Sequence, residues 1–121
     1  MQLTDFFELD GMTRNKLRPG ELVTHLTIPK DSAQWEGDYQ KLRQRESWDF
    51  PEAGVAVMWK MNGKNSPNDL RVATTGLESI PGFHQSQAQY ALEDWNGKES
   101  IKSLAESIRK AVKPVQNTWY T

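Results

Sequence analysis

Hydrophobic and polar residues alternate along much of the first two thirds of the chain, with the period of a β-strand. The clearest alternation places Val55, Val57 and Trp59 on one face of a strand. The first alternating segment of the chain ends at Pro29. In that earliest segment one face carries Leu22, Thr24, Leu26 and Ile28, and the other carries Val23, His25 and Thr27. The pattern predicts four strands, over residues 21–28, 38–45, 53–62 and 70–77.

Turn residues separate these segments. Asn62-Gly63 and the following Ser66-Pro67 predict a hairpin between the third and fourth strands. Residues 3–7 form a short helical turn in this interpretation, with Thr4 or Asp5 as its cap.

After Pro81-Gly82 the period changes to that of a helix. Ser86 and Gln89 have the spacing of a capping box, and Asn96-Gly97 is a stop signal. The apolar residues of the first helix are Ala88, Ala91, Leu92 and Trp95, and those of the second are Ile101, Leu104, Ala105, Ile108 and Val112, before Pro114. Strands followed by helices predict an α+β fold, in which an antiparallel sheet is covered on one face.

The composition fits one folded domain spanning residues 1–121. Only 36% of the residues are hydrophobic, but five Trp, four Phe and three Tyr bury large areas and favour a packed core. Trp59 and Trp95 fall on apolar faces and are predicted to be in the core. Trp35, Trp48 and Trp119 lie in less regular stretches and are candidates for an interface with a missing partner.

Charge and cysteine content exclude several classes of protein. The chain has 15 basic and 16 acidic residues, so it lacks the electrostatic footprint of a nucleic-acid-binding protein. It has no cysteine, which excludes disulfides, thiolate-bound metals and a cysteine nucleophile. With no leader-like start and no run of about 18 apolar residues, we expect a cytoplasmic protein without a membrane segment.

No catalytic or metal-binding constellation is apparent. His25 and His84 are far apart, so a structural or solvent-facing role is expected for both. A glycine-rich phosphate loop and a nucleophile elbow are both missing. Asp49 and Glu52 flank Phe50-Pro51, and Asp49 is interpreted as a helix cap rather than as part of a pocket.

The unusual segment is residues 39–50. One face of its predicted strand carries Tyr39, Lys41, Arg43 and Arg45. Two interpretations are open at this point. The face is either the solvated side of an edge strand, or a positive wall against an anionic ligand or the carboxylates of another subunit.

A set of short motifs points to a family. They are Phe6-Phe7, Thr13, Leu17, Pro19-Gly20-Glu21-Leu22, Ile28-Pro29, Tyr39-x-Lys41-x-x-x-Arg45-x-x-x-Asp49-Phe50, Val55-Ala56-Val57, Gly76, Ile80-Pro81, Ala91-Leu92 and Gly97-Lys98. Their order and spacing over about residues 5–112 resemble the C-terminal domain of the FAD subunit of molybdenum hydroxylases, the family of carbon monoxide dehydrogenase and xanthine dehydrogenase.

The resemblance implies a three- to four-stranded antiparallel sheet with two or three helices on one face. It also implies oxidoreductase partners: an N-terminal FAD-binding domain, and iron–sulfur and molybdopterin subunits or domains that pass electrons to the flavin. Within the motif, Lys41 would approach the pyrimidine edge of the FAD, while Tyr39, Arg45 and Asp49 would support it. No residue of this chain is expected to be catalytic, and no metal is expected.

The chain departs from the family pattern in two ways. The FAD-binding domain that should precede residue 1 is missing, and residues 116–121 only echo the family's usual ending. Tight FAD binding by this chain alone is therefore not expected. The function expected is an accessory domain that completes a flavin site and contacts neighbouring subunits. The alternatives are an interaction module that kept the fold without flavin and, more remotely, a small enzyme with an unseen site.

Overall fold

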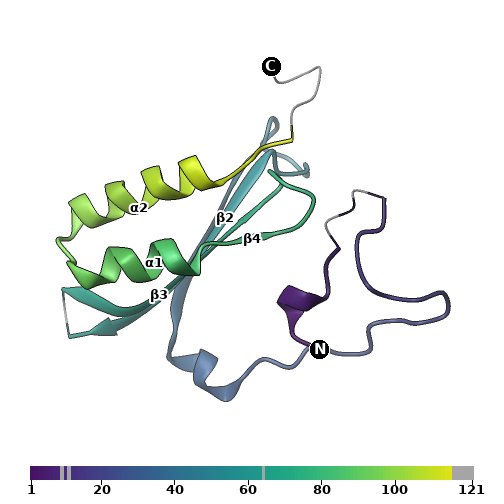
Figure 1. The fold of residues 1–121 in the computed structure, drawn as a ribbon, viewed down its shortest axis with the longest axis horizontal. Helices are drawn as coiled ribbons and strands as arrows, with labels where there is room; N and C mark the ends of the chain where they lie inside the picture. The colour runs from purple at the N-terminus through teal and green to yellow at the C-terminus, as the bar shows by residue number, and fades with distance from the viewer. Residues whose placement is uncertain (9, 11, 64, 116–121) are drawn as a thin grey trace.

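A computed structural model describes residues 1–8, 10, 12–63 and 65–115, and shows a sheet with two helices on one face (Figure 1). The described elements, in chain order, are the 3-10 turns η1 (Leu3–Asp5) and η2 (Lys30–Gln34), the strands β1 (Glu36–Leu42), β2 (Ala53–Asn62), β3 (Ser66–Thr75) and β4 (Gly82–Phe83), and the helices α1 (Gln85–Glu93) and α2 (Lys98–Ala111). The predicted α+β fold class, with an antiparallel sheet and helices, is confirmed.

The sheet has the order β1-β2-β3-β4, and each neighbouring pair is antiparallel. In its register Val57 of β2 lies between Asp38 of β1 and Val72 of β3. Because strand side chains alternate between faces, residues paired in this way share one face. The predicted strand over 53–62 and its hairpin to β3 are both confirmed.

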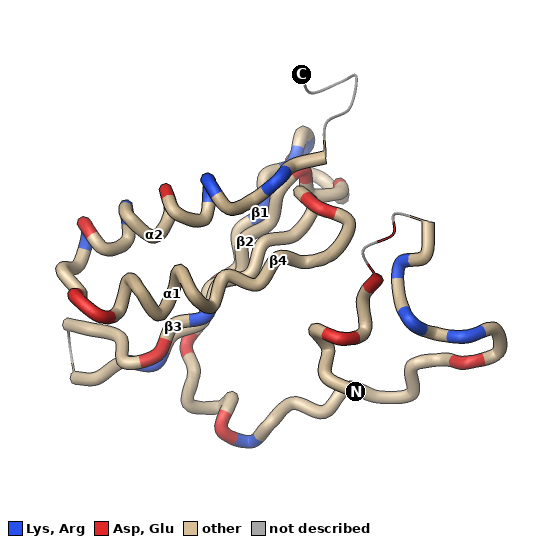
Figure 2. The backbone as a smooth tube through the Cα atoms, viewed as in Figure 1, with Lys and Arg blue, Asp and Glu red and all other residues tan. Residues whose placement is uncertain are grey.

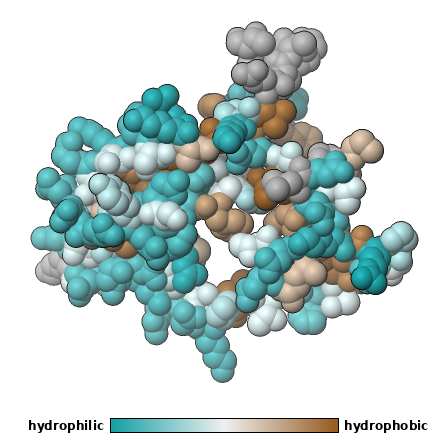
Figure 3. All heavy atoms as spheres, in the orientation of Figure 1, coloured by the Kyte–Doolittle hydropathy of each residue, from teal (hydrophilic) through white to brown (hydrophobic). Residues whose placement is uncertain are grey.

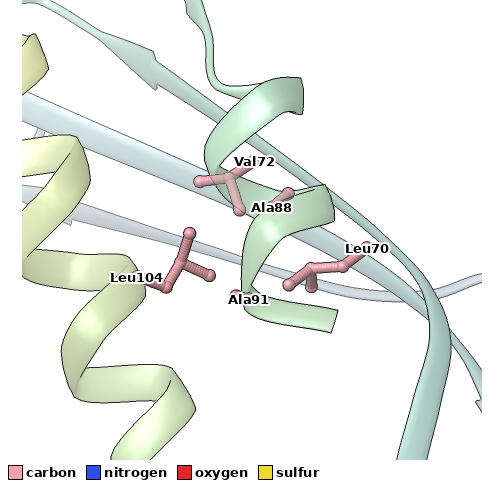
Figure 4. Packing of buried hydrophobic residues seen from close by; sticks show 5 residues of the cluster. All are labelled: Leu70, Val72, Ala88, Ala91 and Leu104. Atoms are coloured by element: carbon pink, nitrogen blue, oxygen red, sulfur yellow. The ribbon is translucent and has the colours of Figure 1, made fainter. Parts of the chain in front are cut away.

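The core lies between β3 and the two helices (Figure 4). Its buried hydrophobic residues are Leu70, Val72, Ala88, Ala91 and Leu104, with Val57, Trp59, Leu92 and Ile108 packed against them. Ala88 is 0% exposed, and its small side chain lets α1 lie close to β3. This core is small, since none of the large described side chains is completely buried.

His84 has a structural role at the entry to α1. Its backbone N–H donates to the Val72 carbonyl at 2.9 Å, and its Nε2 lies 2.9 Å from the Thr74 hydroxyl oxygen. Burial of the imidazole lowers the pKa of His84 below 6.5, although the Glu78 carboxylate acts in the opposite direction. His25 is exposed, as expected for a histidine without ligand neighbours.

The predicted strand over 21–28 is wrong for the described chain. These residues form no ladder, and all of them are exposed, because no neighbouring strand offers them backbone partners. The second predicted strand begins earlier, at Glu36, and ends at Leu42, so Arg43 and Arg45 lie beyond it. The short β4 was not predicted.

The predicted helix caps also need correction. α1 begins at Gln85, before Ser86, and has no side-chain cap, so the capping box is wrong. Gly97 adopts a left-handed φ of 56° and stands directly before α2, between the two helices. The turn η1 is confirmed, but its N-cap is Gln2 and no side chain caps it, so neither Thr4 nor Asp5 has that role.

We expect the free energy of unfolding to decrease as the pH falls below 6.5. The pKa of His84 is lower in the folded chain than in the unfolded chain, so the unfolded chain binds a proton at His84 more readily. Acid therefore favours unfolding. Urea titrations between pH 7.5 and 5.5 measure this slope. It should become shallower in His84→Gln and stay unchanged in the control His25→Gln. An equal slope in wild type and His84→Gln would contradict the assignment.

Candidate functional site

The predicted site lies on the edge strand β1 and the loop that follows it. Among the described strands β1 pairs only with β2, and all seven of its residues are exposed. The loop is closed where the Glu52 backbone N–H donates to the Leu42 carbonyl at 2.8 Å. Residues 43–51 therefore connect two antiparallel strands, and the loop is anchored at both ends.

Asp49 holds this loop together. Its carboxylate accepts hydrogen bonds from the Arg45 backbone N–H at 3.2 Å, from Arg45 Nε at 3.3 Å and from the Phe50 backbone N–H at 2.9 Å. Its side chain is only 18% exposed. The interpretation of Asp49 as a helix cap is wrong, because the residues after it lead into β2 and not into a helix.

The same contacts affect the ionisation of Asp49. The hydrogen bond from the Arg45 side chain is the main cause that lowers the pKa of Asp49 below 3.8. Burial acts in the opposite direction. The positive charge of Arg45 and the two backbone N–H groups lower the pKa further. The carboxylate is therefore ionised at neutral pH and forms a charge-assisted pair with Arg45.

Lys41 is bound to this loop through the backbone. Its Nζ donates to the Asp49 carbonyl oxygen at 3.2 Å, across eight positions of sequence. Lys41 pairs with Gly54 in the β1–β2 ladder and Tyr39 pairs with Ala56, so both side chains project from the sheet face opposite to the helices. The structure thus brings Lys41, Arg45 and Asp49 together.

Tyr39 lies two residues before Lys41, on the same face. A Cβ at Gly54 would come within 2.6 Å of the Tyr39 hydroxyl oxygen, so the absence of a side chain at Gly54 makes room for the tyrosine ring. Tyr39 remains 50% exposed. It therefore offers an aromatic surface and a hydroxyl beside Lys41.

Trp35 has a role within the chain that its sequence context did not indicate. The Lys60 ammonium lies 4.9 Å from the centroid of the Trp35 ring, and the Arg71 guanidinium lies 4.2 Å from it. Cations at these distances are attracted to the ring. Trp35 is therefore held against the sheet face that also carries Tyr39 and Lys41.

The other tryptophans divide as follows. Trp59 packs against the core, and Trp95 is partly buried. Trp48 is 93% exposed and its loop neighbour Phe50 is 87% exposed, which suits the predicted interface. Trp119 lies outside the described residues.

A separate apolar groove lies on the helix side of the sheet, between α2 and the strands β2 and β3. Its volume is about 750 Å³. The lining is mainly aliphatic and aromatic, including Val55, Trp59, Met61, Ile101 and Ile108. Arg109 is the one charged residue among the described residues that line it. The groove therefore has no acid–base pair, and it opens on the face opposite to Lys41.

Neither a metal centre nor a membrane helix is found in the described ranges. No group of three or more His, Asp or Glu side chains within residues 1–8, 10, 12–63 and 65–115 is placed to hold a metal ion. In the same ranges no helix is both long and apolar enough to cross a bilayer.

No family model matches the sequence. The fold, however, is similar to parts of solved dehydrogenase and oxidoreductase chains. Carbon monoxide dehydrogenase from Oligotropha carboxidovorans matches with a TM-score of 0.78 and 19% identity, over 96% of this chain and 39% of that chain. Carbon monoxide dehydrogenase from Hydrogenophaga pseudoflava, in a form that lacks the Mo-pyranopterin moiety, matches with a TM-score of 0.62 and 21% identity. This match covers 74% of this chain and 30% of that chain.

Quinoline 2-oxidoreductase from Pseudomonas putida 86 matches with a TM-score of 0.61 and 15% identity, over 73% of this chain and 30% of that chain. At these identities the likeness establishes the fold. The chain spans between 30% and 39% of the length of the three solved chains described. The fold of this protein is thus one that occurs as a part of larger chains in carbon monoxide dehydrogenase and quinoline 2-oxidoreductase.

Proposed function

We propose that this protein is an accessory domain of a molybdenum hydroxylase-type oxidoreductase, which completes the FAD site of a larger flavin subunit. The observation that carries the proposal is the arrangement of Lys41, Arg45 and Asp49 at the end of an exposed edge strand. These residues belong to the motif that resembles the flavin subunits. The fold similarity to carbon monoxide dehydrogenase over 96% of the chain supports the same assignment.

The residues present fit the edge of a flavin. Lys41 is exposed, and its hydrogen bond to the Asp49 carbonyl uses one of the three N–H donors of an ammonium group. Lys41 would hold the pyrimidine edge of the FAD, whose chemistry is to accept and pass on electrons. A fixed positive charge at that edge favours the anionic reduced form electrostatically.

The neighbouring residues would position Lys41. Asp49 is fixed by Arg45 and by two backbone N–H groups, and its own carbonyl then directs the Lys41 ammonium. Tyr39 lies beside Lys41 on the same face, where its ring can cover part of the bound cofactor. Tyr39, Arg45 and Asp49 are therefore supporting residues in this proposal, and no catalytic residue is assigned to the chain.

The partners in this proposal are an N-terminal FAD-binding domain, which would hold most of the cofactor, and iron–sulfur and molybdopterin subunits or domains, which would supply the electrons. Trp48 and Phe50 in this loop offer exposed aromatic surface for such contacts. The same two residues also favour a second candidate function, an interaction module that binds a protein partner without flavin.

Titration with FAD distinguishes the two functions. We expect weak or no binding to the chain alone, and tighter binding of FAD to a mixture with an N-terminal FAD-binding domain than to that domain by itself. Flavin fluorescence quenching measures both. A complex of the two proteins that leaves FAD affinity unchanged would favour the interaction module.

Lys41→Ala, made in a full flavin subunit that contains this domain, should lower the flavin reduction potential. Loss of the charge removes a stabilisation of the anionic reduced flavin, with an expected shift on the order of 30 mV, or about 1.4 kcal/mol for two electrons. Spectroelectrochemical titration measures the shift. Lys102→Ala is the control, since Lys102 lies on α2 and pairs with Glu99. An unchanged potential and unchanged FAD retention would remove this role from Lys41.

Protonation of Asp49 should loosen the loop only in acid. Because the folded pKa is lowered, the carboxylate contributes stability above pH 3.8, which is lost as the pH falls through the folded pKa. A carbon-detected NMR titration of the Asp49 carboxyl measures this midpoint. Asp49→Asn should accelerate amide exchange at Arg45 and Phe50 already at pH 6, while Val57 and Val72 in the sheet keep their protection. A midpoint at or above 3.8 would contradict the pairing with Arg45.

A further inference from the structure

The N-terminal arm, residues 12–29, contains a strand-like segment that has no described strand beside it. Figure 1 shows the arm looping away from the sheet before it returns through η2. Its base is anchored, because Phe7 and Asn15 form an antiparallel bridge and the Lys16 backbone N–H donates to the Phe6 carbonyl at 2.9 Å. Beyond this base, residues 22–28 make no backbone hydrogen bond to any other described residue.

The apolar side chains of this segment are unusually exposed. Leu22 and Leu26 are each 72% exposed, and Ile28 is 76% exposed. All three belong to the same face in an extended conformation, since they are separated by even numbers of residues. Burial of aliphatic side chains of this size is favourable, so the exposed row favours association with another surface. In Figure 3 hydrophobic residues stand among the hydrophilic ones on the arm.

The sheet edges of this chain do not match the row. β4 has only two residues. β1 is long enough, but one of its faces carries Glu36, Asp38 and Gln40, and the other carries Gly37, Tyr39 and Lys41. A strand added to β1, from the same chain or from a second copy, would place the apolar row either beside polar and charged side chains or beside a face on which Tyr39 is the one large apolar side chain. Cross-strand neighbours of that kind do not bury an apolar row.

We propose that residues 21–28 become a β-strand by adding to the open edge of a sheet in the adjoining domain of the larger subunit, with Leu22, Leu26 and Ile28 on its core side. Main-chain hydrogen bonds would supply affinity, and the apolar row would fix the register. This proposal rests on one part of the proposed function, namely that the chain lies beside another domain of a larger subunit. It does not depend on the flavin role of Lys41.

The course of the arm supports this choice of partner. The match to the Oligotropha carbon monoxide dehydrogenase chain covers 96% of this chain with a TM-score of 0.78, so it includes most of the arm. The match takes up 39% of that chain, which leaves the larger part of it to lie elsewhere. A segment that is matched as part of a much larger chain is in a position to contact the rest of that chain. Figure 2 shows basic residues along the arm before the segment, namely Arg14, Lys16 and Arg18.

The test uses the whole chain, fused through a flexible linker to the part of the Oligotropha chain that lies outside the match. The fusion raises the effective concentration of the partner sheet. Hydrogen exchange at the amides of residues 22–28 is measured in the fusion and in the chain alone. We expect exchange close to that of an unfolded peptide in the chain alone, and slowing by at least about 100-fold in the fusion.

Two variants identify the face that docks. Leu26→Asp should abolish the protection in the fusion, because it places a charge in the apolar row. Thr27→Asp, on the opposite face, is the matched control and should keep it. Both residues are exposed in the chain alone, so neither change should alter its thermal unfolding.

Two outcomes overturn the proposal. Fast exchange at residues 22–28 in the fusion would show that the segment does not pair with that domain. Concentration-dependent protection in the chain alone, with a dimer in sedimentation, would assign the segment to a second copy. Protection of residues 22–28 together with no effect of Lys41→Ala on the flavin would remove the flavin role from Lys41 and leave this inference standing. Fast exchange at residues 22–28 together with a changed flavin potential in Lys41→Ala would refute only this inference.

Discussion

The antiparallel ladder between β2 and β3 is the constraint on which the rest of the structure depends. It places Trp59 opposite Leu70 and Val57 opposite Val72, which creates the apolar face that α1 and α2 cover. A slip of one residue would send this row to the other face, so the apolar pattern itself fixes the register. The same register, continued into β1, turns Tyr39 and Lys41 away from the helices.

The parts of the fold that sequence periodicity predicts well are those whose pattern is long and agrees with the packing. Residues 53–62 became β2 and the apolar spacing after Gly97 became α2 because both elements bury one face against the same core. β4 could not be predicted, since two residues carry no period and pair only because the chain returns to β3. Residues 21–28 show the opposite case. Their pattern is that of a strand, but a strand also needs a neighbour, and the described chain supplies none.

The candidate site was predictable as a group of residues but not as a geometry. The motif from Tyr39 to Asp49 named the residues, yet the carbonyl of Asp49 as the partner of Lys41 became apparent only from the returning loop. The helix-cap interpretation failed because an aspartate before a turn can accept local N–H groups in a loop as well as at a helix start. The contact of His84 with Thr74 likewise depends on how the chain returns to β3 after Pro81-Gly82, which marks a turn but not its partner.

The small core gives this domain a physical reason to gain stability from contact with a partner. No large described side chain is completely buried, and the chain relies on one hairpin and two helices for its apolar contacts. Contact of a partner with Trp48 and Phe50, or with the arm, would therefore bury apolar surface that adds substantially to the small apolar area buried within the domain. These surfaces belong to different segments, so a partner that covers both must extend around the domain. The rest of a larger chain would meet that requirement. In the solved chains of similar fold, the matched part makes up between 30% and 39% of the chain.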